Sequence, residues 1–250
     1  MSRQAAGFFG AVGDVISASS ATELLQLLKE INIDVPPRGK GRTSAHRERY
    51  CLVKYLSHLL CVGRLEFPIT VRRNQPDNKS PDFLLGLVSG RTVGLEHSDA
   101  GPESYQKADA IADADSAVVF LDLPYYSKHP RIHARKSLAK GFVSAGAKLQ
   151  GDGWMNDEPE RQWAQFIAAA IRKKRQRIKR GHYDHCDEYE LLIYDNTPTM
   201  ALNYGKALLA LKARVRTTKP FVRVSVLDCH QVFHDVLGRT PVNRPSTVAS

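Results

Sequence analysis

Two acidic residues on neighbouring predicted strands are the first feature of this sequence that could do chemistry. Asp82 lies near the start of PDFLLGLV (81–88) and Glu96 lies in RTVGLEHS (91–98), with a Ser-Gly turn between the two segments. A β-hairpin brings two such carboxylates to the same edge of a sheet, within reach of one cation. Their oxygen ligands suit Mg²⁺ or Mn²⁺ rather than zinc, and such a cation supports phosphodiester hydrolysis. The alternative is that both side chains are simply solvated.

Glu48 is an acidic residue within the apolar stripe of a predicted helix. The helix runs from an N-cap at Ser44 to about Val62, and its stripe contains Ala45, Leu52, Tyr55, Leu56 and Leu59. An isolated buried charge is costly, so Glu48 is expected to be paired, protonated or linked to a metal. Alternatively, it lies in the exposed first turn, where the helix dipole favours acids.

Lys174 is likewise a charged residue within the apolar face of a predicted helix, which runs from Glu158 to about Gly181. It projects near the middle of an apolar face formed by Trp163, Phe166, Ile167, Ala170, Ile171 and Ile178. There the lysine either supplies a positive charge to the acidic site or packs its stem and extends its ammonium to water.

The elements around these residues alternate between helix and strand. Besides the hairpin, strands are predicted at 189–196 and 221–228, and helices at 22–30, 102–114 and about 200–215, whereas 117–123 fits either a strand or a buried helix segment. This order predicts an α/β fold with a mixed sheet. We divide the chain into an N-terminal extension (1–43), one domain (44–237) with a basic insertion at about 124–157, and a flexible tail (238–250).

The acidic hairpin resembles the PD-(D/E)xK motif of the restriction-endonuclease-like nucleases. In that motif Pro-Asp opens one strand and Glu-x-Lys lies on the next, as in S-P-D-F followed by V-G-L-E-H-S here. The preceding helix with Glu48 is similar to the acidic helix that many members place before the motif. The resemblance covers roughly residues 44–230 as topology, although the motif itself is only a few residues long.

The resemblance implies a restriction-endonuclease-like central mixed β-sheet flanked by helices, and Mg²⁺-dependent phosphodiester cleavage, with Mn²⁺ as a substitute. Asp82 and Glu96 would bind the metal, with Glu48 as an auxiliary acid and the backbone carbonyl of His97 as a further ligand. Ser98 stands where the family has its lysine, which orients or activates the attacking water. Lys174 is the best replacement, followed by Lys107.

Basic residues indicate a polyanionic partner. The chain has a formal net charge of +10, and its densest basic run, RKKRQRIKRGH (172–182), contains Arg172, Lys173, Arg175, Lys179 and Arg180. Arg135 and Lys136, with Arg131 and Lys140, add basic charge in the insertion. Such a surplus favours nucleic acid through counterion release, although basic runs are often only solvated helix faces. DNA is the expected partner, and RNA stays open.

Other classes of protein lack their usual signals. No run approaches the roughly 18 apolar residues of a membrane span, and no signal peptide is evident. Four scattered cysteines suit a reducing cytoplasm. His182, His185 and Cys186 lack the second ligand pair of a zinc site, and Cys229, His230 and His234 are equally unpromising. No GxGxxG, GxxxxGK[ST] or GxSxG motif occurs.

The sequence therefore predicts a cytoplasmic Mg²⁺-dependent DNA endonuclease, with restriction or defence as the context that the resemblance implies. Glu48, Asp82, Glu96, Ser98 and Lys174 are its candidate catalytic residues, and a homodimer would let it cut both strands. Two alternatives stay open: a catalytically inactive nucleic-acid-binding module of the same fold, and an adaptor whose basic surface binds another acidic partner.

Overall fold

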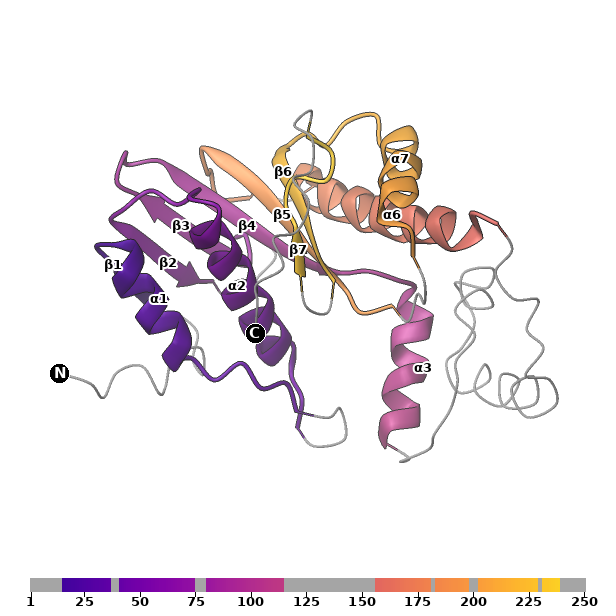
Figure 1. Ribbon diagram of the computed structural model, residues 1–250, viewed down its shortest axis with the longest axis horizontal. Coiled ribbons are helices and arrows are strands. Elements are labelled where there is room, and N and C mark those ends of the chain that lie inside the picture. The colour runs from indigo at the N-terminus through magenta and orange to yellow at the C-terminus, as the bar shows by residue number, and fades with distance from the viewer. Residues whose placement is uncertain are drawn as a thin grey trace.

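The computed structural model describes residues 15–36, 41–74, 80–114, 156–180, 183–197, 202–228 and 231–238. These residues form a mixed α/β fold, in which a seven-stranded sheet carries helices on both faces (Figure 1). The segment 117–123, all but the end of the predicted insertion, and the predicted tail beyond Gly238 lie outside the described residues. Among the described helices, none has the length and apolar character that crossing a membrane requires.

The strands lie side by side in the sheet in the order in which they occur along the chain. They are β1 (Val15–Ala18), β2 (Ile69–Arg73), β3 (Phe83–Leu87), β4 (Thr92–Asp99), β5 (Glu188–Asp195), β6 (Phe221–Asp228) and β7 (Gln231–Phe233). From β1 to β4 each strand is antiparallel to the next, β4, β5 and β6 are parallel, and β7 is antiparallel to β6. In β5 and β6, runs of four consecutive buried residues fit strands that are covered on both faces.

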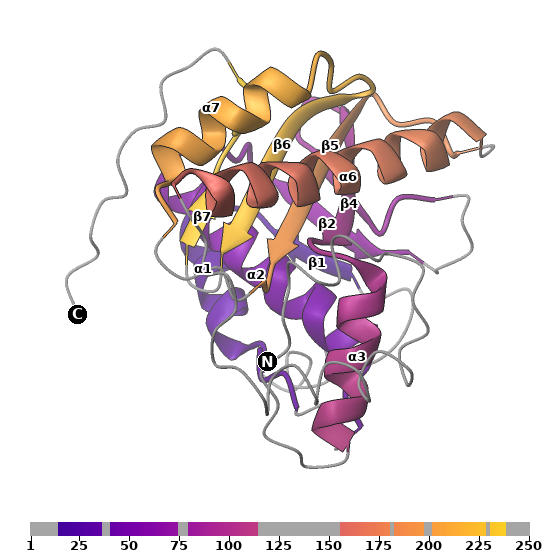
Figure 2. The same ribbon diagram turned by 90° about the vertical axis from the view of Figure 1, so that its right-hand side faces the viewer.

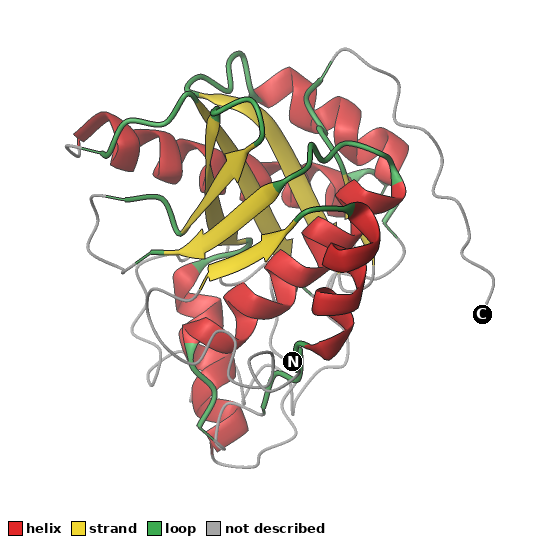
Figure 3. Cartoon of the chain, turned by 90° about the vertical axis from the view of Figure 1, so that its left-hand side faces the viewer, coloured by secondary structure: helices red, strands yellow, loops and turns green. Residues whose placement is uncertain are grey.

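Helices cover the two faces of the sheet in pairs. The face with α1 (Ala21–Glu30) and α2 (Ser44–Cys61) is toward the viewer in Figure 3. Figure 2 shows α6 (Glu158–Arg180) in front of β5 and β6, on the opposite face, with α7 (Tyr204–Arg214) beside it. Each pair buries its own hydrophobic cluster against the sheet. The last described helix, α3 (Glu103–Ala114), extends from the end of β4 away from the sheet (Figure 1).

The predicted hairpin is confirmed, with a longer connection than the sequence indicated. Phe83 pairs with Leu95 and Gly86 with Thr92 in an antiparallel register. The connection spans residues 88–91 rather than two residues, and Gly90 within it has a φ of +77°. Glycine is favoured at such an angle because it lacks a Cβ atom.

Helix boundaries agree with the sequence to within a few residues. Ser44 is the first residue of α2 rather than its N-cap, which is Thr43. Ser20 caps α1 by accepting a hydrogen bond from the backbone N–H of Glu23. The helix predicted at about 200–215 begins at Tyr204, because Asn203 provides its N-cap and accepts from the backbone N–H of Lys206 at 3.1 Å.

Three strands in the structure were not predicted from the sequence. They are β1, β2 and β7, which have four, five and three residues. As a result, residues 15–36, which the sequence placed in an N-terminal extension, contribute β1 to the sheet and α1 to the layer above it. The described part of the extension thus shares one core with the domain.

Candidate active site

Asp82 and Glu96 lie opposite each other on the hairpin of β3 and β4. Asp82 immediately precedes β3, and the pairing of Phe83 with Leu95 places it beside Glu96 on the same face of the sheet. This is the face that α6 covers. The Glu96 side chain is completely buried, and that of Asp82 is 18% exposed. The two carboxylates therefore converge under the helix, at the edge of its contact with the sheet.

Lys174 of α6 joins the two carboxylates. Its Nζ atom lies 2.9 Å from Oδ2 of Asp82 and also forms an ion pair with Oε2 of Glu96. Only 10% of the lysine side chain is exposed, since its stem packs on the helix face that contacts the sheet. Of the two positions that the sequence left open for this ammonium, water and the acidic site, the structure has it at the acidic site.

The charges in this cluster shift the pKa values of the two carboxyls in opposite directions. Burial by itself would raise the pKa of Asp82, but the charge of Lys174 and a 2.7 Å hydrogen bond from the backbone N–H of His97 hold it below its usual value. Burial and the neighbouring charge of Asp82 raise the pKa of Glu96. The pair thus consists of a firmly ionised Asp82 and a Glu96 that is closer to protonation.

Tyr183, which sequence reasoning missed, completes the cluster. It follows α6, and its hydroxyl donates to Oε1 of Glu96, while the Arg177 guanidinium lies 5.9 Å from its ring centre. Burial and the charge of Glu96 raise the pKa of this phenol, so it stays a donor. No sequence pattern marks Tyr183, because its contact with Glu96 joins residues that are 87 positions apart in the sequence.

Replacing Tyr183 by Phe should destabilise the protein by about 1–3 kcal/mol, because a buried carboxylate oxygen loses its donor. The measurement is the free energy of unfolding in urea. Tyr189→Phe is the matched control: the Tyr189 hydroxyl donates to the backbone carbonyl of Asp184 at 2.7 Å and accepts from the backbone N–H of Cys186 at 3.3 Å, so its contacts do not involve a carboxylate. Equal losses for the two variants would show that the Glu96 contact contributes nothing of its own.

Glu48 lies in a different ion pair, made by α2. Its Oε2 atom accepts from the Arg73 guanidinium of β2 at 2.9 Å. On the same side of the sheet, Arg47 forms an ion pair with Asp99, and burial lowers the pKa of His97. Odd-numbered β4 residues face α2, whereas Glu96 faces α6. Within the described residues, no group of three or more acidic, histidine or cysteine side chains could hold a metal, so Glu48 does not form such a group with Asp82 and Glu96.

The other two candidates for the missing motif lysine, Ser98 and Lys107, have different partners. Ser98 alternates onto the same face as Glu96, and its hydroxyl donates to the backbone carbonyl of Asp99 at 3.4 Å. Lys107 lies in α3 and forms an exposed ion pair with Glu103 at 2.7 Å. Among these candidates, Lys174 has the carboxylates as its partners.

The basic residues of α6 point in several directions. Arg172, Lys173, Lys179 and Arg180 are exposed, whereas Arg175 is half-buried and donates through Nε to the backbone carbonyl of Lys219 at 2.8 Å. Arg135 and Lys136, with Arg131 and Lys140, lie outside the described residues, as do His182, Cys229 and His230.

Comparison of the chain with known proteins identified no relative. No family model, no curated protein and no solved structure matched the chain. Function must therefore be inferred from the cluster itself.

The cluster fits a divalent cation with oxygen ligands. Both carboxylates already contact one positive group, the Lys174 ammonium, so they can also reach one metal ion. Mg²⁺ is commonly bound through only one or two carboxylates, with water and substrate phosphates completing its ligands. A third acidic side chain is therefore not required. Because the ammonium occupies the position between the carboxylates, a cation bound to both of them would have to displace Lys174 from at least one.

Proposed function

We propose that this protein is a metal-dependent nuclease of the PD-(D/E)xK kind, with a restriction-endonuclease-like sheet, that hydrolyses DNA phosphodiester bonds. The observation that carries the proposal is the convergence of Asp82 and Glu96, from adjacent strands, on the Lys174 ammonium. The mixed sheet and the helices on both of its faces support the same family. The net charge of +10 favours a polyanionic substrate.

In this proposal the side chains divide the work between holding a cation and handling the phosphate. Asp82 and Glu96 would hold Mg²⁺ or Mn²⁺, which when bound neutralises charge on the phosphate and makes water a better nucleophile. The His97 N–H fixes one oxygen of Asp82, and the Tyr183 hydroxyl fixes one oxygen of Glu96. Lys174, released from one carboxylate, would orient the attacking water and stabilise the charge developing on the phosphate.

One assay tests the proposal. Supercoiled plasmid and single-stranded DNA are incubated with the protein in Mg²⁺, Mn²⁺ or EDTA, and cleavage is followed on gels. We expect cleavage that needs the metal and is lost in Glu96→Gln. The matched control is Glu30→Gln, an exposed glutamate at the end of α1 on the other side of the sheet, which should cut like the wild type. The proposal would be refuted if the wild type cut DNA in EDTA and the Glu96→Gln variant cut DNA as well.

A nucleic-acid-binding module of the same fold is the second candidate. The observation that favours it is that Lys174 already satisfies both carboxylates without a metal. For such a module the same assay would show DNA binding in EDTA that weakens with salt, and no cutting with either metal.

A further inference from the structure

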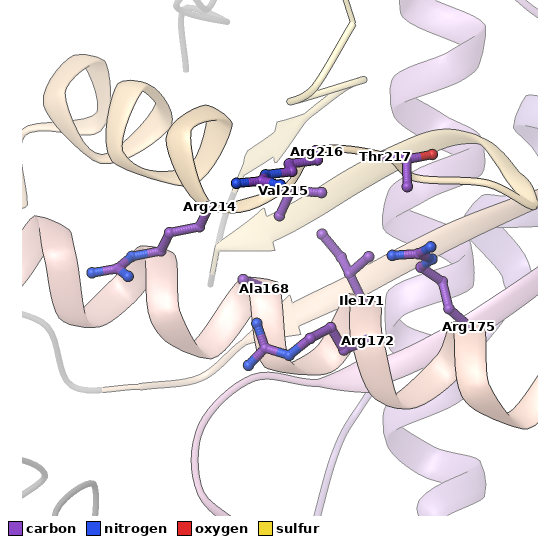
Figure 4. Close-up of a pocket in the computed structure, with 8 residues that line it drawn as sticks. All are labelled: Ala168, Ile171, Arg172, Arg175, Arg214, Val215, Arg216 and Thr217. Carbon is purple, nitrogen blue, oxygen red and sulfur yellow. The ribbon is translucent and has the colours of Figure 1, made fainter.

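Four arginines from two segments surround a pocket on the side of α6 that faces α7. Arg172 and Arg175 come from α6, Arg214 is the last residue of α7, and Arg216 follows it in the connection to β6 (Figure 4). The pocket has a volume of about 210 Å³. Between the arginines, Ile171 and Val215 supply apolar walls. Sequence reasoning identified Arg172 and Arg175 within a basic run, but it did not identify the partners that α7 brings to them.

This pocket is distinct from the carboxylate cluster, although one helix serves both. Ala168, Ile171, Arg172 and Arg175 recur at helical spacing and form one stripe of α6. At about 100° per residue, that stripe is centred roughly a quarter to a third of a turn around the helix from Lys174. Lys174 therefore points to the sheet while the arginines point toward α7.

The arginines of the pocket, unlike four other arginines of the molecule, have no carboxylate partner among the described residues. Arg47, Arg73, Arg91 and Arg223 each form an ion pair with a carboxylate. Within the described residues, no ion pair joins Arg172, Arg175, Arg214 or Arg216 to an acidic side chain. Four like charges at one pocket repel each other, and an anion would relieve that repulsion.

Local structure accounts for only part of this arrangement. The C-terminal end of α7 favours a positive charge, which explains Arg214. The bond from Arg175 Nε to the carbonyl of Lys219 fixes that side chain and uses one of its five N–H donors. Neither effect requires Arg172 and Arg216 at the same pocket. Arg172, Arg214 and Arg216 are exposed, so their donors are available to a ligand.

We propose that this arginine pocket binds phosphate groups of a nucleotide or of a nucleic acid strand, outside the carboxylate cluster. The guanidinium fork matches two phosphate oxygens at once, which makes arginine the preferred side chain for such anions. The pocket has room for a phosphate and part of its sugar or base, which Ile171 and Val215 would contact. Binding of a nucleic acid strand at this pocket rests on the proposed function, because it assumes that the chain binds nucleic acid. Binding of a free nucleotide does not depend on that function.

Binding measured in EDTA tests the pocket without any cleavage. The probes are pyrophosphate and ATP by calorimetry, and a fluorescent single-stranded oligonucleotide by anisotropy. For the double variant Arg214→Gln/Arg216→Gln we expect affinity for at least one probe to fall about 10-fold or more, since it loses two charge-assisted donors. The control is Lys29→Gln/Lys212→Gln, which removes the same charge from exposed lysines outside the pocket and should bind like the wild type.

The outcomes separate the two sources of phosphate. Loss of pyrophosphate and ATP binding in the arginine variant assigns the pocket to a nucleotide, whereas loss of oligonucleotide binding alone assigns it to a strand. If no probe distinguishes the arginine variant from the lysine control, the proposal is wrong. Melting temperatures of all variants establish that they are folded. Glu96→Gln should keep pocket binding, so failure of the proposed nuclease activity and failure of this pocket give different results.

Discussion

Replacing Lys174 by Met should destabilise the protein by about 3–5 kcal/mol in EDTA, the typical cost of breaking a buried ion pair by removing one partner. The variant keeps the packing of the lysine stem but leaves Asp82 and Glu96 facing each other under α6 without a cation. Part of the cost is relieved if Glu96, whose pKa is already raised, takes up a proton. The measurement is the free energy of unfolding in urea.

A divalent cation should reverse this loss, which connects the stability of Lys174→Met to the proposed metal site. Mg²⁺ or Mn²⁺ at about 100 times its dissociation constant would restore about 2.7 kcal/mol. The wild type should gain less, because a cation has to displace the Lys174 ammonium first. Lys179→Met, at an exposed position of the same helix, is the control and should change stability by less than about 0.5 kcal/mol. A Lys174→Met protein that metals do not stabilise would argue against a metal site at these carboxylates.

The proximity of Lys174 to Asp82 and Glu96 could be predicted, because the direction of each side chain follows from a short-range rule. Period two in a hairpin sets which strand residues share a face, and period 3.6 in α6 sets which helix residues face the sheet. A lysine in the middle of an apolar helix face has few partners to choose from once acids lie on the strand below.

The position of Glu48 could not be predicted in the same way. Its helical stripe shows that the residue points inward, but not which face of the sheet the helix covers. Its partner, Arg73, lies on β2, a five-residue strand that the sequence did not reveal. Short strands such as β1 and β7 have little pattern of their own and are defined by their partners.

The contact of Tyr183 with Glu96 and the arginine pocket also could not be predicted from the sequence. Tyr183 contacts Glu96 across 87 positions of the sequence, and the pocket exists because α7 ends beside the middle of α6. Both contacts join segments whose relation is set by packing on the sheet, and no local pattern specifies them. The charge of the basic run and the inward position of Lys174 were visible in the sequence, but the pocket that Arg172 and Arg175 share with Arg214 and Arg216 was not.

Asp82→Asn should lower metal-dependent DNA cleavage by about 100- to 1000-fold, comparable to removing one preorganised electrostatic group from an active site. The change is nearly isosteric, so the amide oxygen of the variant can still accept from the His97 N–H, and Lys174 keeps its pair with Glu96. The variant loses one of the two negative charges that would hold the cation. Cleavage rates on plasmid DNA in Mg²⁺ and Mn²⁺ provide the measurement.

The reason for expecting a defect in chemistry rather than in binding is also electrostatic. Removing a negative charge from a basic protein does not weaken its attraction for DNA, so affinity in EDTA should stay equal to that of the wild type or increase. Asp34→Asn, at an exposed position before α2, is the matched control and should cut normally. If Asp82→Asn cuts at the wild-type rate, the carboxylate pair is a structural ion cluster, and the assignment of cleavage to this site is wrong.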